Sequence, residues 1–383
     1  MADRILTTHA GSLPRPLALT GLYARSAAGG AVDEAELAAA GKAALTDILA
    51  KQAAARVDIA NNGEQQREAF FLYLRHRLSG IGGRWKRPPR GDVARYPDLG
   101  EAQAAAAAEK VAVSNMDPPK TIGAIAHAKP EACEAECADF DAALKAGGYS
   151  FPGTFLTAPS PGIVAAALKN EHYDTEEAYL SALAAALRVE YETILRHGHR
   201  LQLDCPELGL EGHLTYDGRP KEFLGFVERA IAAIGEAIEG LPADRIRLHL
   251  CWGNYEGPHD LDTPLADFWG IVKQAKVGGF VLPFANPRHA HEWRVLKASP
   301  PAENQTIAAG VIDTLTNFVE HEEVVADRLE TVARAIDDPS RVMACTDCGF
   351  DTSAGMGRVA PSVVWAKLSQ MAKGAELASA RLF

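Results

Sequence analysis

The chain has 383 residues, 47% of them hydrophobic and 23% charged, with a formal net charge of −11 and a pI near 5.6. This length allows one large barrel or two ordinary domains. The acidic balance argues against nucleic acid as a partner, and no apolar run is long enough for a membrane span. The first residues lack the apolar segment of a secretory signal. We therefore expect a cytoplasmic protein whose six cysteines are reduced and suited to metal binding or catalysis.

Short apolar segments alternate with helical segments along most of the chain. Strand candidates begin near residues 5, 56, 150, 200, 246, 279, 306 and 341, and helical candidates include 34–55, 175–197, 221–241 and 321–336. This alternation indicates parallel β/α units, and eight units predict an α/β (β/α)8 TIM barrel. A doubly wound open sheet is the alternative, but no G-x-G-x-x-G follows the first strand.

Residues 68–148 are less regular than the rest of the chain. No change to a linker-like composition sets them apart from their neighbours. We therefore interpret them as an excursion between the second and third strands, inside a single domain that spans residues 1–383.

The segment from 245 to 254 has the pattern of a short buried strand that ends in a Gly/Asn turn. Side chains two residues apart on a strand point to the same face, so His249 and Cys251 project together. One imidazole and one thiol make half of a tetrahedral zinc site. A buried histidine that lies beside a buried cysteine by chance is the simpler alternative, and this pair alone does not exclude it.

Chemically capable side chains recur just after the predicted strands. They are Ser12, Glu64, Asp204, His249 with Cys251, Asp313 and Cys348. In a barrel these strand ends converge on one face, where active sites lie, so Cys348 is expected to join His249 and Cys251. The simpler roles are a turn for Ser12, a helix cap for Glu64, a salt bridge for Asp204 and organisation of the rim for Asp313.

Two histidines, His289 and His291, follow the sixth predicted strand, and their residue type is one that often ligates metals. A spacing of two residues on a helix turns them to different faces, which argues against a shared metal.

The ordered motifs carry a family resemblance that covers nearly the whole chain. They are Thr8-His9-Ala10-Gly11-Ser12-Leu13-Pro14-Arg15, Gly63-Glu64, Asp204-x-Pro206, His249-x-Cys251, Ala285-Asn286-Pro287-Arg288-His289 and Thr346-Asp347-Cys348-Gly349-Phe350. Together they resemble the catalytic C-terminal barrel of cobalamin-independent methionine synthase. The chain is more closely similar to the shorter single-barrel members of that superfamily, which include epoxyalkane:coenzyme M transferase.

The resemblance implies a zinc ion (Zn²⁺) held by a His-x-Cys pair, a glutamate and a distal cysteine. The pair corresponds to His249 and Cys251, and the distal cysteine to Cys348. The family's homocysteine-binding residues correspond to Ser12, Glu64 and Asp204. Zinc keeps a bound thiol as a thiolate, which is the nucleophile. The resemblance thus implies methyl transfer to a homocysteine-like thiol, with a small-molecule thiol and an alkyl donor as partners. A homo-oligomer is left open.

The chain departs from the family pattern at two positions. Pro283 stands where the family has its glutamate ligand, and proline cannot ligate. Either three protein ligands leave the fourth position open to substrate, or another residue such as Cys345 takes it. Leu315 stands two residues after Asp313, where methionine synthase has a histidine thought to help protonate its folate donor, so methyltetrahydrofolate as donor is in doubt. Asp313 itself is kept as a catalytic candidate.

These departures leave two alternatives to methyl transfer. One keeps the thiolate chemistry but opens an epoxide, as epoxyalkane:coenzyme M transferase does. The other is a non-catalytic barrel in which Cys345 closes a structural zinc site.

Overall fold

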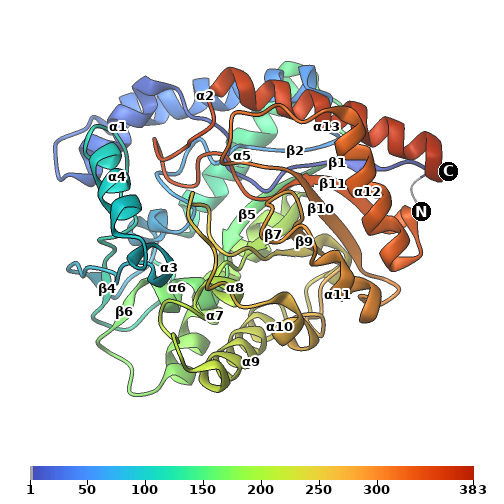
Figure 1. The fold of residues 1–383 in the computed structure, drawn as a ribbon. Helices are drawn as coiled ribbons and strands as arrows, with labels where there is room; N and C mark the ends of the chain where they lie inside the picture. The colour runs from blue at the N-terminus through green and yellow to red at the C-terminus, as the bar shows by residue number, and fades with distance from the viewer. Residues whose placement is uncertain (1–2) are drawn as a thin grey trace.

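The structure is a computed structural model that describes residues 3–383, and its centre is an eight-stranded parallel barrel (Figure 1). The strands follow one another around it in the order β1-β11-β10-β9-β8-β7-β5-β2, and every neighbouring pair in this order is parallel. They are β1 (Leu6–Thr7), β2 (Ile59–Asn61), β5 (Gly153–Pro159), β7 (Arg200–Asp204), β8 (Ile246–His249), β9 (Gly279–Pro283), β10 (Thr306–Ile312) and β11 (Val342–Thr346). Each predicted strand is present.

The two end strands of this order, β1 and β2, are joined by single hydrogen bonds instead of a continuous ladder. The backbone N–H of Asp58 donates to the carbonyl of Thr7 at 3.2 Å. The hydroxyl of Thr8 donates to the carbonyl of Ile59 at 3.1 Å. These bonds bring the two end strands together, and the predicted TIM-type barrel is confirmed.

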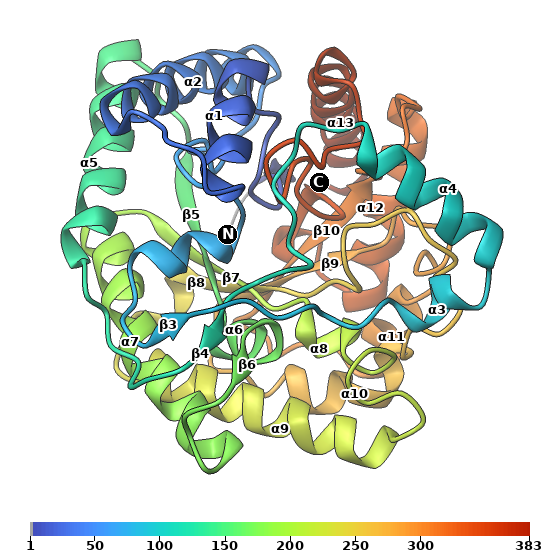
Figure 2. The same cartoon turned by 90° about the vertical axis from the view of Figure 1, so that its left-hand side faces the viewer.

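Helices form a ring outside the strands (Figures 1 and 2). Those of seven or more residues beside the barrel are α1 (Leu17–Ala27), α2 (Glu34–Ala54), α5 (Pro130–Gly147), α6 (Pro161–Ala167), α7 (Glu176–Arg196), α9 (Pro220–Ala237), α10 (Leu265–Val272), α12 (Glu322–Ile336) and α13 (Pro361–Leu382). Short helices α8 (Glu207–Leu210) and α11 (Trp293–Ala298) lie near the rim. Across residues 3–383, none of the helices has the length and apolar character needed to cross a bilayer.

The helix starts follow ordinary capping chemistry. Thr175 accepts a hydrogen bond from the backbone N–H of Ala178 at 3.1 Å, and Ser160 accepts one from Ile163 at 3.0 Å. Proline occupies the first turn of α5, α6, α9 and α13, where its missing N–H leaves no hydrogen bond unmade. The sequence thus sets where the barrel helices begin.

The excursion crosses the face of the barrel (Figure 2). It contains a 3-10 turn (Leu72–His76), α3 (Gly91–Ala94), α4 (Pro97–Ala108) and two short strands, β3 (Ile81–Gly82) and β4 (Lys120–Thr121). These strands form a small sheet with β6 (Lys169–Asn170), which follows α6. Helix α5 also falls within residues 68–148, but it packs between α2 and α7 in the outer ring. The irregular part of the segment therefore ends before α5.

Buried ion pairs attach the start of the excursion to the outer helices. Arg67 and Arg77 both pair with Glu136 of α5, at 2.8 and 2.7 Å. Arg77 also pairs with Glu190 of α7 at 2.9 Å, and the hydroxyl of Tyr73 donates to Glu190 at 2.6 Å. Removal of one member would leave a buried charge without its partner, so this network holds the segment in one position.

Candidate active site

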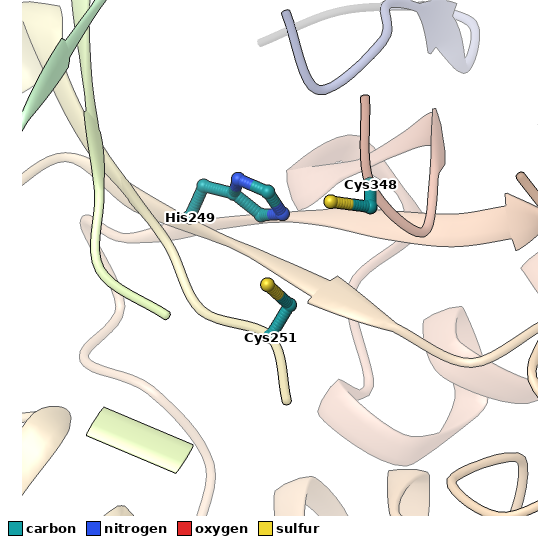
Figure 3. A group of neighbouring side chains, drawn as sticks. All are labelled: His249, Cys251 and Cys348. Carbon is teal, nitrogen blue, oxygen red and sulfur yellow. The ribbon is translucent and has the colours of Figure 1, made fainter. Parts of the chain in front are cut away.

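Three side chains converge where β8 and β11 end, and Figure 3 shows them pointing toward one another. His249 and Cys251 come from β8 and the residues that follow it, and Cys348 comes from the loop after β11. All three are buried, and one donor atom from each lies within 4.8 Å of the other two. The strand spacing and the closure of the barrel therefore bring together the three residues predicted as metal ligands.

A chain of hydrogen bonds orients the imidazole of His249. Its Nδ1 lies 2.9 Å from Asp204 Oδ1, and that oxygen also accepts from Gln202 Nε2 at 2.9 Å. Gln202 in turn accepts from Arg247 Nε at 2.9 Å. An N–H on Nδ1 that donates to the carboxylate leaves Nε2 with its lone pair facing the cysteines, the usual arrangement of a metal-ligating histidine.

The charges around the two sulfurs favour one thiolate. Burial alone would lower the pKa of His249, but Asp204 and Cys251 outweigh it and raise that pKa to about 10. The hydrogen bond from the Cys348 thiol, together with His249, lowers the pKa of Cys251 well below its ordinary value despite burial. The same pairing and burial raise the pKa of Cys348.

One imidazole nitrogen and two sulfurs are a donor set that suits zinc. Both cysteines and His249 line a cavity whose other walls come from the rim and the excursion. The residues present therefore fit a zinc ion with three protein ligands and a side open to the cavity.

Glu64 reaches this cavity from the loop after β2. Its backbone is left-handed, with φ of 56°, and its Oε1 accepts a hydrogen bond from Thr157 Oγ1 at 2.9 Å. Oε2 is buried without a hydrogen-bond partner among residues 3–383. Burial first, and the nearby charge of Asp204 second, raise the pKa of Glu64 to about 7. An unsatisfied carboxylate oxygen at a cavity wall is suited to a cationic group of a ligand.

Ser12 connects the loop after β1 to the loop that carries Cys348. Its carbonyl accepts from the N–H of Phe350 at 2.8 Å, and its hydroxyl accepts from the N–H of Asp351 at 3.3 Å. A Cβ at Gly349 would lie 2.1 Å from the Ser12 hydroxyl, so only glycine allows this approach. Ser12 therefore positions the Cys348 loop as well as lining the cavity.

Asp313 and Cys345 are not among the lining residues of this cavity, although Asp313 lines a second cavity that Cys251 and Cys348 also border. Asp313 Oδ1 accepts from the backbone N–H groups of Leu315 and Thr316, at 2.5 and 3.1 Å, which closes a turn of its own loop. Cys345 packs with Ala10, Val281 and Ala308 inside the barrel, and it is not among the clustered donors within residues 3–383. Burial raises the pKa of its thiol to about 12.

The three residues after Pro283 are held by the carboxylate of Asp347, which follows β11. Asp347 Oδ1 accepts from the N–H groups of Phe284 and Ala285, both at 3.0 Å, and its Oδ2 accepts from Asn286 at 2.6 Å. This bonding fixes the loop after β9 beside Cys348. Asp347 belongs to one of the sequence motifs, but its role is not predictable from the sequence, because nothing local shows that its partners lie about sixty residues earlier.

Two arginines from the excursion also line the cavity, Arg87 and Arg90, together with Asn115. Arg87 pairs with Glu211 at 3.1 Å. Arg90 lies 4.1 Å from the ring centroid of Tyr255, and its guanidinium makes no hydrogen bond or ion pair within residues 3–383. No sequence pattern points to either arginine, since only the path of the excursion brings them to the rim.

No protein-family model matches the chain. A methionine synthase of Pyrococcus abyssi is 26% identical over 184 residues, which are 47% of this chain and 46% of that protein. The matched region thus spans about half the length of this curated relative.

Two solved structures share the fold. A B12-independent methionine synthase from Shewanella sp. W3-18-1, in complex with selenomethionine, gives a TM-score of 0.71 at 21% identity and covers 99% of both chains. A putative vitamin-B12 independent methionine synthase from Listeria monocytogenes gives 0.65 at 21% identity, over 97% of this chain and 98% of that one. The predicted superfamily resemblance is confirmed by these findings.

Proposed function

We propose that this relative of the cobalamin-independent methionine synthases is a zinc-dependent thiol alkyltransferase, with methyl transfer to a homocysteine-like thiol as its first form. The observation that carries this proposal is the shared cavity. His249, Cys251 and Cys348 line it together with Ser12, Glu64 and Asp204, so metal donors and polar substrate contacts face the same space.

The protein groups divide into metal donors and substrate contacts. When zinc is held by His249, Cys251 and Cys348, it supplies a Lewis acid that favours loss of the proton from a thiol. Glu64, with its unpartnered oxygen, is suited to the ammonium group of an amino-acid thiol. Asp204 keeps His249 in the tautomer that a metal needs. The carboxylates of Asp204 and Glu64 also attract the cationic group of such a substrate.

In the transfer step the thiol sulfur forms a new bond to the alkyl carbon as the bond from that carbon to its donor breaks. The leaving group departs with the electron pair of the broken bond, and the thiol proton is released. Burial of the donors at the base of the cavity excludes water, which strengthens the charge interactions there.

X-ray absorption at the zinc edge tests the proposal on the purified full chain, with and without homocysteine. We expect two sulfur ligands, rising to three when the thiol is added. Three sulfurs from the start, with no change, would favour the non-catalytic barrel and Cys345 as the fourth ligand. Cys345→Ser is the matched variant, because it removes a buried thiol outside the clustered donors.

A screen of alkyl donors then separates the substrate alternatives. Methylated folate, a methyl corrinoid and small epoxides are offered with homocysteine, and thioether formation is measured. Absence of any thioether product with zinc and thiol both bound would contradict the transferase proposal.

One observation favours the second candidate, addition of a non-amino-acid thiol to an epoxide. The unpaired guanidinium of Arg90 at the cavity wall is suited to a sulfonate or another anionic group on the thiol. For this candidate, Arg90→Gln should raise the KM for 2-mercaptoethanesulfonate at least ~10-fold and leave kcat unchanged. A change of this size is expected from the loss of one charge-assisted hydrogen bond. An equal rise in the KM for homocysteine would show that Arg90 does not distinguish the two candidate thiols.

A further inference from the structure

A second group of metal-ligand side chains lies beside the cysteine-containing one. It consists of His259, Asp262 and His289, which we call the histidine–aspartate cluster. His259 and Asp262 are in the loop after β8, and His289 is in the loop after β9. All three are buried, and one donor atom from each lies within 4.8 Å of the others. His259 and His289 line a second cavity that Cys251 and Cys348 also line.

Both imidazoles of the cluster converge on one carboxylate oxygen. Asp262 Oδ2 lies 2.7 Å from Nδ1 of His259 and 2.8 Å from Nε2 of His289. The two histidines are thirty residues apart in the chain, so this geometry is made by the packing of two rim loops.

The hydrogen bonds of His259 leave its Nδ1 and the Asp262 carboxylate to share either a proton or a metal ion. Its Nε2 faces the carbonyl of Tyr255 at 3.1 Å, and a carbonyl can only accept. The Nε2 proton is thus committed there, and a neutral ring presents the Nδ1 lone pair to Asp262. Two lone pairs 2.7 Å apart repel unless a proton or a metal ion lies between them. A ring N–H that donates to a backbone carbonyl is the usual support for a metal-ligating histidine.

A third imidazole points at the cluster without a hydrogen-bond partner. His213, in the loop after α8, has a side chain only 2% exposed, and neither ring nitrogen makes a hydrogen bond within residues 3–383. Its Nδ1 lies 3.4 Å from Asp262 Oδ1, which also lacks a hydrogen bond. Buried polar atoms are almost always paired, so these two indicate an additional ligand at this position.

The surrounding residues hold the cluster rigidly. His259 adopts a left-handed φ of 54°, which is strained for a residue with a side chain. Asp92 of the excursion supports it by accepting from the N–H of His259 at 3.0 Å and from the Tyr255 hydroxyl at 2.6 Å. Trp252 stacks on His289 with ring centroids 3.8 Å apart. The strained residue is thus held by a contact from outside its own loop, the Asp92 carboxylate of α3, as is typical of a site whose geometry matters.

We propose that His259, Asp262 and His289 bind a second divalent transition-metal ion, and His213 lies beside this site at the other carboxylate oxygen of Asp262. The nitrogen and oxygen donors of this site suit Zn²⁺, Co²⁺ or Fe²⁺, and it contains no sulfur. It is therefore chemically distinct from the site of His249, Cys251 and Cys348, and it does not rest on the function proposed above. Trp252 follows Cys251 and stacks on His289, so it contacts both groups.

Cobalt titration of the metal-free full chain tests this proposal. Bound metal is counted by mass spectrometry after gel filtration, and the optical spectrum reports thiolate-to-cobalt charge transfer. We expect two equivalents in the wild-type chain. The double variant His259→Gln/His289→Gln should keep one equivalent with the charge-transfer band. Cys251→Ser/Cys348→Ser should keep one equivalent without it.

His291→Gln is the matched control, because His291 is exposed and two residues from His289. It should bind two equivalents. Circular dichroism confirms that each variant is folded. The proposal is overturned if His259→Gln/His289→Gln binds as much cobalt as the wild-type chain, or if the wild-type chain binds only one equivalent.

A measurement on the wild-type chain covers the case in which the double variant does not fold. X-ray absorption of protein loaded with one zinc and then one cobalt equivalent, in both orders, should give one metal environment with nitrogen and oxygen neighbours only. Sulfur neighbours around both metals in every loading order would contradict a sulfur-free second site.

Discussion

The cysteine-containing group and the histidine–aspartate cluster lie on neighbouring loops of one rim, but they are built differently. His249 and Cys251 are two residues apart at the end of β8, so the strand itself turns both side chains to one face. In the cluster, His289 meets Asp262 only because the loops after β8 and β9 fold against each other. Regular backbone geometry can be read from a sequence, whereas loop packing cannot.

The two groups also differ in what keeps their imidazoles in place. His249 is oriented by a line of side chains inside the barrel, which runs from Arg247 through Gln202 to Asp204. His259 is oriented by backbone groups and by Asp92 of the excursion. We therefore expect the first group to depend on the barrel interior and the second on the crossing segment.

The largest effect should follow from Cys348→Ser. Loss of one of three ligands should weaken zinc binding at the cysteine-containing site by more than about 100-fold and abolish thiol alkylation. Zinc affinity is measured by competition with a chelator, and thioether formation by mass spectrometry. Cys345→Ser should leave zinc binding within a few-fold of the wild-type value. Full zinc retention and activity in the Cys348 variant would refute the assigned metal site.

Asp204→Asn should have the next largest effect. An amide at this position cannot hold the N–H of His249 as a carboxylate does, so zinc affinity should fall about 10- to 100-fold. The second cobalt equivalent, at the histidine–aspartate cluster, should be unaffected. Equal loss at both sites would show that the two groups do not bind metal independently.

Glu207 on the same rim shows how a buried acid behaves without an imidazole partner. It is fully buried, Ser160 donates to its Oε1 at 2.6 Å, and its Oε2 has no partner within residues 3–383. Burial raises the pKa of Glu207 from 4.5 to about 8. The folded chain therefore binds this proton more tightly than the unfolded chain, and the group lowers stability as pH rises from about 4.5 to about 8.

Glu207→Gln should remove that decline. The free energy of unfolding of the variant minus that of the wild-type chain should rise by more than ~1 kcal/mol between about pH 5 and about pH 8.5. Above that range the difference should change little. Urea unfolding at several pH values measures the difference. A difference that is flat with pH would mean that the carboxyl is solvated in the folded protein.

Trp252→Phe should produce the smallest effect. Trp252 Nε1 donates to the carbonyl of Thr263 at 2.8 Å, and phenylalanine loses that bond while keeping a ring over His289. The chain should lose about 1 kcal/mol of stability, measured by thermal unfolding. Both cobalt equivalents should remain, because a ring still stacks on His289. Loss of only the second equivalent would show that the indole itself holds His289.

Much of this molecule follows from the sequence alone. All eight strands, the barrel, and the meeting of His249, Cys251 and Cys348 follow from a period-two pattern, alternating elements and the rule that parallel strand ends share one face. Ser12, Glu64 and Asp204 line the predicted rim for the same reason. Their roles toward substrate, and that of Asp313, stay predictions.

The remaining contacts depend on how distant segments pack against one another. Asp347 reaches the loop at Pro283, Arg90 reaches the cavity, and His213 reaches Asp262 through segments with no repeating pattern. Such segments follow the packing of whatever lies beneath them, because no backbone hydrogen-bond ladder constrains their path. A local pattern therefore specifies which side chains a strand presents, whereas the meeting of two loops depends on the whole folded chain.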